Sequence, residues 1–153
     1  MEPNNKSLQI PKQPNFEVDS EITGIYKLED ETEIEIRIIL VDLSIFSEDI
    51  LGIQHAVQVT TVIRYKVTDK IKQEIQSKPL VFPGKNIPLT EEAGFKSIKI
   101  VETLKEAQSS YKFDNHKIIL SLIIDGIVKN DNYKTPSGIP IYNLRWRINT
   151  NIK

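Results

Sequence analysis

The chain has 153 residues, with 20 basic and 21 acidic side chains, 39% hydrophobic residues and no cysteine. A chain of this length can bury enough surface for one core, and the absence of cysteine excludes thiolate metal sites and a cysteine nucleophile. The apolar runs are far shorter than the roughly 20 residues that a membrane-spanning helix requires. We therefore expect one domain that needs no cofactor and crosses no membrane.

Residues 1–15 are polar, contain Pro3, Pro11 and Pro14, and include no apolar stretch of signal-peptide length. Such a segment cannot build a core of its own. We predict an extended N-terminal arm over residues 1–15 and a single β-rich domain over residues 16–153. Because no signal peptide is recognisable, we expect the protein in the cytoplasm or in a virion, not among secreted proteins.

Apolar residues recur at every second position in most of the chain, which is the period of a β-strand. The predicted strands cover residues 16–28, 32–41, 53–67, 117–128 and 142–149. The strand over 117–128 is apolar on both faces, which is typical of a central strand. In the last strand Trp146 shares a face with Leu144 and Ile148, so we expect Trp146 to be a buried anchor.

Short polar segments separate these strands and predict tight turns between antiparallel neighbours. The turns are expected at residues 29–31, 114–115 and 136–138.

Two segments have helical character. Thr68 or Asp69 can cap a short helix in which Ile71 and Ile75 share a face. Residues 100–111 fit either a helix or a strand, and we favour the helix. The sequence thus predicts a mainly β fold, an antiparallel sandwich or barrel of about six strands, with one or two short helices.

Charge is unevenly distributed along the chain. Residues 17–49 contain eleven acids and two bases, a balance of −9, whereas residues 50–153 contain sixteen bases and nine acids, a balance of +7. The two segments either pair inside one fold, the alternative that we favour, or present oppositely charged surfaces to neighbouring molecules. The candidate interface residues are Glu29, Asp30, Glu31, Glu33, Glu35, Arg145, Arg147 and Lys153.

Residues with catalytic or metal-binding chemistry are scattered. His55 and His116 have no second ligand at helical spacing, and no phosphate-binding or nucleophile motif occurs. Asp125 lies among apolar residues that could raise its pKa, but Asp125 and Gly126 together are more typical of a β-bulge or a strand end. We therefore predict no catalytic residue, no metal site and no enzymatic activity.

Nucleic-acid binding is also disfavoured. Tyr142 and Trp146 alternate with Arg145 and Arg147, so the aromatic and basic side chains would point to opposite faces of one strand. The isoelectric point near 6.1 does not indicate a strong phosphate-binding surface.

The remaining features favour a non-enzymatic structural protein that forms oligomers through its β-domain and N-terminal arm. A virion component, such as part of a phage head, neck or tail, is the most specific form of this hypothesis. The expected partners are copies of itself and other proteins of an assembly, arranged head to tail in a ring if charge directs the contact. The alternatives are a β-barrel carrier of an apolar small ligand, or a protein-binding adaptor or inhibitor.

Overall fold

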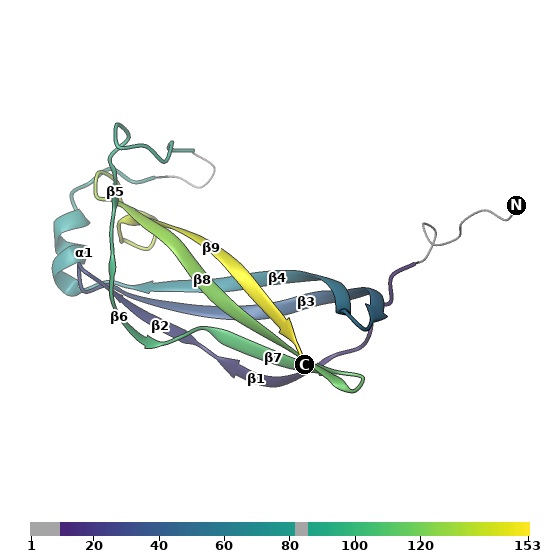
Figure 1. Ribbon diagram of the computed structural model, residues 1–153. Coiled ribbons are helices and arrows are strands. Elements are labelled where there is room, and N and C mark those ends of the chain that lie inside the picture. The colour runs from purple at the N-terminus through teal and green to yellow at the C-terminus, as the bar shows by residue number, and fades with distance from the viewer. Residues whose placement is uncertain (1–9, 82–85) are drawn as a thin grey trace, which may run out of the picture.

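The computed structural model describes residues 10–81 and 86–153, which form two antiparallel sheets and one short helix (Figure 1). The first sheet contains, in spatial order, β4 (Gly52–Lys66), β3 (Glu33–Asp49), β2 (Gly24–Leu28) and β6 (Ile100–Lys105). The second contains, in order, β1 (Glu17–Ile22), β7 (Gln108–Phe113), β8 (His116–Asn130) and β9 (Ile141–Ile152), and the short β5 (Phe95–Ser97) also pairs with β8.

This architecture confirms the predicted mainly β fold, and the sandwich is the observed alternative. The turn at residues 29–31 joins β2 to β3, and the turn at residues 114–115 joins β7 to β8, both as antiparallel neighbours. The predicted helix is also confirmed. Helix α1 (Asp69–Ile75) begins after Thr68, whose hydroxyl accepts a hydrogen bond from the Ile71 amide at 3.3 Å.

The helix that we favoured over residues 100–111 is wrong, because this segment forms β6 and β7. Pairing of β6 with β2 and of β7 with β8 supplies hydrogen bonds and buried contacts that outweigh the helical propensity of the segment. The predicted strand over residues 16–28 is divided into β1 and β2 at Thr23. The described residues therefore form nine strands instead of about six.

The core lies between the two sheets, where alternate residues of the long strands meet. Ile34, Ile36 and Ile38 of β3 are at most 2% exposed, and Ile118 and Leu120 of β8 are fully buried. Full burial of one such side chain contributes roughly 1.5–3 kcal/mol. The period-two pattern of the sequence therefore points every second side chain of these strands inward, and these buried side chains hold the two sheets together.

One side of the sandwich is formed by chain segments that pass from one sheet to the other. The chain crosses at Thr23, between β1 and β2, and again at Glu106 and Ala107, between β6 and β7. The crossings lie against each other, since the Ala107 amide donates to the Tyr26 hydroxyl at 2.8 Å. A Cβ atom on Gly24 would lie 2.7 Å from the Ala107 backbone nitrogen, so only glycine fits this crossing.

The opposite side of the sandwich ends in two edge strands, β4 and β9. Their inward side chains meet across the layers: the Tyr65 and Tyr142 rings stack at 5.0 Å, and His55 Nε2 lies 3.0 Å from the Thr150 hydroxyl. Trp146 points toward this interior as predicted but is only half-buried. The prediction of a fully buried Trp146 is therefore wrong: Tyr142 on the same face of β9 belongs to the core, whereas Trp146 does not.

Candidate functional site

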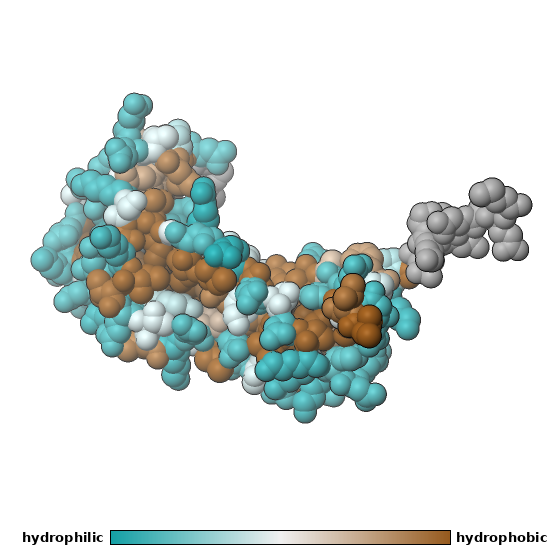
Figure 2. All heavy atoms as spheres, in the orientation of Figure 1, coloured by the Kyte–Doolittle hydropathy of each residue, from teal (hydrophilic) through white to brown (hydrophobic). Residues whose placement is uncertain are grey.

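An exposed apolar surface lies where the long β3–β4 hairpin ends. The hairpin turns at Ile50 and Leu51, whose side chains are 101% and 94% exposed. Ile10 and Phe46 lie beside this turn and are 90% and 51% exposed. We call these four residues the apolar tip. Figure 2 shows apolar atoms at this end of the molecule.

The described part of the N-terminal arm pairs with β3 near the apolar tip. Lys12 and Ile45 exchange two backbone hydrogen bonds of 3.0 and 2.8 Å, and the Gln13 side chain donates to Asp42 at 3.1 Å. Residues 1–9 of the predicted arm lie outside the described residues. The arm segment from residue 10 to residue 15 is thus fastened to the β-domain at the end where Ile50 and Leu51 are exposed.

A pocket of about 290 Å³ opens next to the hairpin turn. Its lining residues come from the arm, from both strands of the hairpin and from the β7–β8 turn: Ile10, Lys12, Pro14, Ile45, Phe46, Ser47, Glu48, Ile53, Phe113, Asp114 and His116. The apolar tip therefore combines a protruding pair of apolar side chains with an adjacent, partly apolar hollow. Exposed apolar surface of this kind marks interaction sites.

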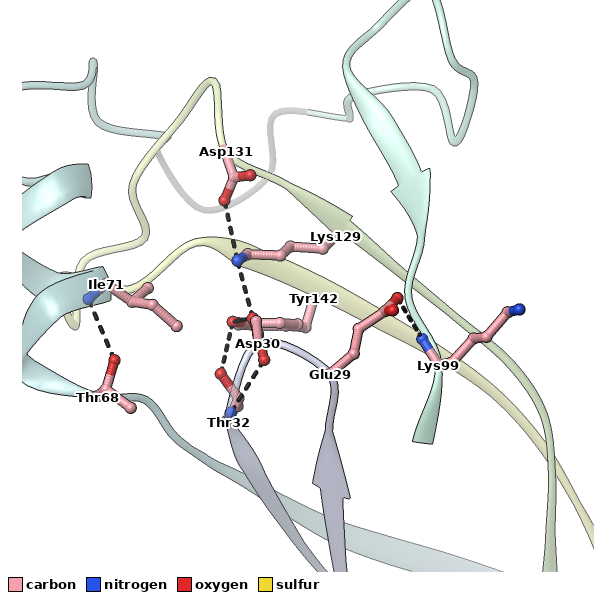
Figure 3. Close-up of polar contacts among 9 residues, drawn as sticks. All are labelled: Glu29, Asp30, Thr32, Thr68, Ile71, Lys99, Lys129, Asp131 and Tyr142. Atoms are coloured by element: carbon pink, nitrogen blue, oxygen red, sulfur yellow. Dashed lines mark hydrogen bonds and ion pairs between the residues drawn. The ribbon is translucent and has the colours of Figure 1, made fainter. Parts of the chain in front are cut away.

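A second candidate is the polar cluster at the opposite end of the sandwich (Figure 3). Asp30 Oδ2 accepts a hydrogen bond from the Tyr142 hydroxyl at 2.7 Å and pairs with Lys129 Nζ at 2.8 Å. The Thr32 amide donates to Asp30 Oδ1 at 2.9 Å, and Lys129 also contacts Asp131 at 3.3 Å. These contacts connect the β2–β3 turn of one sheet to β8 and β9 of the other.

Burial and hydrogen bonding oppose each other in setting the ionisation of this cluster. Burial favours a higher pKa for Asp30, but the hydrogen bonds from Lys129, Tyr142 and Thr32 outweigh it and hold this pKa below its ordinary value. Burial favours a lower pKa for Lys129, yet the Asp30 and Asp131 carboxylates raise it. The pKa of Tyr142 is raised, mainly by burial. Asp30 and Lys129 therefore stay charged at neutral pH, and Tyr142 stays protonated.

The contacts in this cluster stabilise the fold, and they do not favour proton transfer. Each charged group is already paired, and a tyrosine with a raised pKa is a poor base at neutral pH. Within residues 10–81 and 86–153, no group of three or more potential ligands lies close enough to hold a metal ion. The cluster fastens the two sheets at the end near α1.

The residues proposed for charged contacts are not brought together. Glu33 and Glu35 lie on the outer face of the first sheet, whereas Arg145 and Arg147 lie on the outer face of the second. Glu29 accepts a hydrogen bond from the Lys99 amide at 3.0 Å. The other candidates are Asp30 in the polar cluster, Glu31 exposed in the β2–β3 turn and Lys153 exposed after β9.

Several acids of the segment 17–49 have a basic partner within the chain. Three acids pair with bases of the segment 50–153: Asp19 with Lys112 and Lys117, Asp30 with Lys129, and Glu35 with Lys66 and Arg64. Glu21 pairs with Arg37 inside the acidic segment. This arrangement favours the first of the two alternatives that the sequence left open, pairing of the acidic and basic segments inside one fold.

The remaining candidates have structural partners. Asp125 is the extra residue of a β-bulge between Ile124 and Gly126, as the sequence predicts, and it accepts a hydrogen bond from Arg147 at 3.1 Å. His55 contacts Thr150 and the Ile53 carbonyl, and His116 Nε2 lies 3.2 Å from a Glu48 oxygen.

Sequence reasoning missed the apolar tip and the roles of Tyr142 and Lys129. The tip has a recognisable signal, because two apolar residues stand between Asp49 and Gly52 at the point where two alternating strands must turn. The polar cluster has no local signal, since its members are separated by up to 112 positions in the sequence.

No helix in the described part of the chain is long and apolar enough to cross a membrane. Comparison with models of protein families, with curated proteins and with solved structures found no match to this chain.

Proposed function

We propose that the protein is a non-enzymatic structural protein that assembles with copies of itself, and that the apolar tip is one of its contact surfaces. The observation that carries this proposal is the exposure of Ile10, Phe46, Ile50 and Leu51 at one end of the sandwich. Removing apolar surface from water is the main driving force of protein association. A second copy can supply the cover that the described residues, 10–81 and 86–153, do not provide.

The shape of the tip supports a contact between two identical ends. Ile50 and Leu51 protrude, and the pocket of about 290 Å³ lies beside them. In a twofold contact each copy presents the same surface, so the protruding side chains of one copy can enter the hollow of the other. The fastened arm, which contributes Ile10 and Pro14 to the hollow, takes part in the same contact.

The alternatives have less support. An internal carrier needs space between its sheets, whereas here the buried side chains of β3, β7 and β8 occupy the interior. An adaptor would use the same apolar tip for a different protein. A place in a virion stays a prediction of the sequence.

Replacing both tip residues, Ile50→Ser with Leu51→Ser, should weaken self-association at least tenfold without changing the melting temperature, because these side chains contribute nothing to the core. Sedimentation velocity over a concentration series measures the association. The matched control is Leu89→Ser with Leu104→Ser, which alters two side chains that are 55% and 49% exposed and lie away from the tip. Equal association of the tip variant and the control would contradict the proposed role of the tip.

A further inference from the structure

One edge of strand β4, the edge that faces away from β3, is unpaired among the described residues. Its fifteen residues pair with β3, and no other described backbone group forms a hydrogen bond with them. None of its side chains is fully buried. The outer edge of β4 therefore offers a long row of backbone donors and acceptors to an incoming strand.

Proteins usually protect such an edge with charges, proline or bulges. From Ile53 to Ile63 the strand contains no proline, no lysine, no arginine and no acid. The irregularities of the hairpin lie on β3, near Val41 and Phe46, so β4 itself continues without a bulge. The other edge strands differ because they carry charges: Arg145 and Arg147 in β9, three acids in β1, and Glu102 and Lys105 in β6. Within the described sheets, β4 is the long edge that lacks these protections.

We propose that β4 pairs antiparallel with β4 of a second copy, around a twofold axis at Val59. This inference rests on the proposed self-assembly but uses a different surface from the apolar tip. Each copy would contribute its four-stranded sheet to one continuous sheet. Backbone hydrogen bonds would provide the affinity, as in other cases of strand addition.

The register follows from the length and charge of the strand. Val59 is the central residue of β4, so an axis there aligns the full strands and keeps exposed side chains opposite exposed ones. Arg64 then faces Gln54 of the second copy, and Lys66 faces Gly52. In that copy Gln54 and Gly52 pair with Ser47 and Asp49 of β3.

This register places Lys66 of one copy opposite Gly52 of the other, and beyond Gly52, on the same face of the sheet, lies Asp49 of that copy. Lys66 is 45% exposed and lies 2.8 Å from Glu35 of its own chain, and Asp49 is exposed. Gly52 has no side chain, so Lys66 can extend past it toward Asp49 of the second copy. Opposite charges that meet across an interface fix its register and exclude other alignments.

The twofold pairing also leaves both apolar tips free. Because the strands run in opposite directions, the two tips lie at opposite ends of the continuous sheet. Edge pairing would form the dimer, and tip contacts would join one dimer to the next. Two different twofold contacts on one chain generate an extended assembly.

Charged residues introduced beside the twofold axis test this arrangement. Gln58 and Thr60 are exposed, and in the proposed register Gln58 of one copy faces Thr60 of the other. In the variant Gln58→Lys with Thr60→Lys, lysines meet at every one of these cross-strand positions. Like charges directly opposite are destabilising, so dimerisation should weaken at least tenfold.

The matched variant is Gln58→Lys with Thr60→Glu, which puts a lysine opposite a glutamate twice across the axis. This variant should dimerise at least as well as the unmodified protein. Both variants should melt like the unmodified chain, because positions 58 and 60 contribute nothing to the core. Sedimentation equilibrium gives the dimer dissociation constants. Recovery of the dimer in the second variant alone supports the register.

Two outcomes would overturn the inference: unchanged dimerisation in both variants, or equal loss in both. The tip variant Ile50→Ser with Leu51→Ser separates this inference from the proposed function. If the tip variant forms dimers but nothing larger, and adding the two lysines abolishes these dimers, both contact surfaces are supported. If it stays monomeric while the two-lysine variant assembles like the unmodified protein, the tip stands and the edge pairing fails.

Discussion

Replacing Gly24 with alanine should lower the free energy of unfolding by about 3 kcal/mol, because the added methyl group has no space. An ideal Cβ at this position would lie 2.6 Å from the Tyr26 ring and 2.7 Å from both the Cβ and the backbone nitrogen of Ala107. The Tyr26 hydroxyl accepts the hydrogen bond of that same Ala107 amide. The substitution therefore forces apart the two chain crossings that join the sheets.

Urea unfolding followed by circular dichroism measures this change. The matched control is Gly126→Ala in β8, where a Cβ would meet no atom within 4 Å and the backbone does not require glycine. The control should alter the free energy of unfolding by less than about 0.5 kcal/mol. Equal stabilities of the two variants would show that the crossings are not tightly packed.

Replacing Asp30 with alanine should also cost about 3 kcal/mol, because it leaves Lys129 with one partner and removes the acceptor of the Tyr142 hydroxyl. The side chains of Asp30 and Lys129 are only 15% and 14% exposed, so water replaces the lost contacts poorly. The control Asp125→Ala breaks the more exposed pair with Arg147 and should cost less than about 1 kcal/mol.

The same substitution should change the response to acid. The folded pKa of Asp30 lies below its ordinary value of 3.8, so its contribution to stability is present above that pH and is lost as the pH falls through the folded pKa. The Asp30→Ala variant should therefore lose less stability than the unmodified protein below about pH 4. Asp19, whose pKa is lowered to about 2 by Lys117 and Ser110, causes a further acid loss in both proteins. Parallel acid profiles of the two proteins would contradict the role assigned to Asp30.

The alternating strands could be predicted because side chains at every second position of an extended strand point to the same face. Ile34, Ile36 and Ile38 share a face in any extended strand, whatever the strand lies against. The segment 100–111 could not be assigned in this way. Its residues suit a helix locally, and only the partner strands β2 and β8, which lie far away in the sequence, make it extended.

The acidic and basic segments illustrate a second limit. Their separation along the chain suggests oppositely charged surfaces, but antiparallel pairing places Glu35 opposite Arg64 and brings Asp19 to Lys117. A charge pattern in the sequence therefore says little about surface potential until strand pairing is known. The apolar tip is different, since its exposure follows from its place in a two-residue turn.

The mass of the unmodified protein in solution tests self-assembly most directly. Sedimentation velocity should be recorded over a wide concentration range at low and high salt. We expect dimers that grow into larger species as concentration rises, and that persist at high salt because salt screens apolar and backbone contacts little. A monomer at every concentration and salt would contradict the proposed assembly through the apolar tip and through β4 alike.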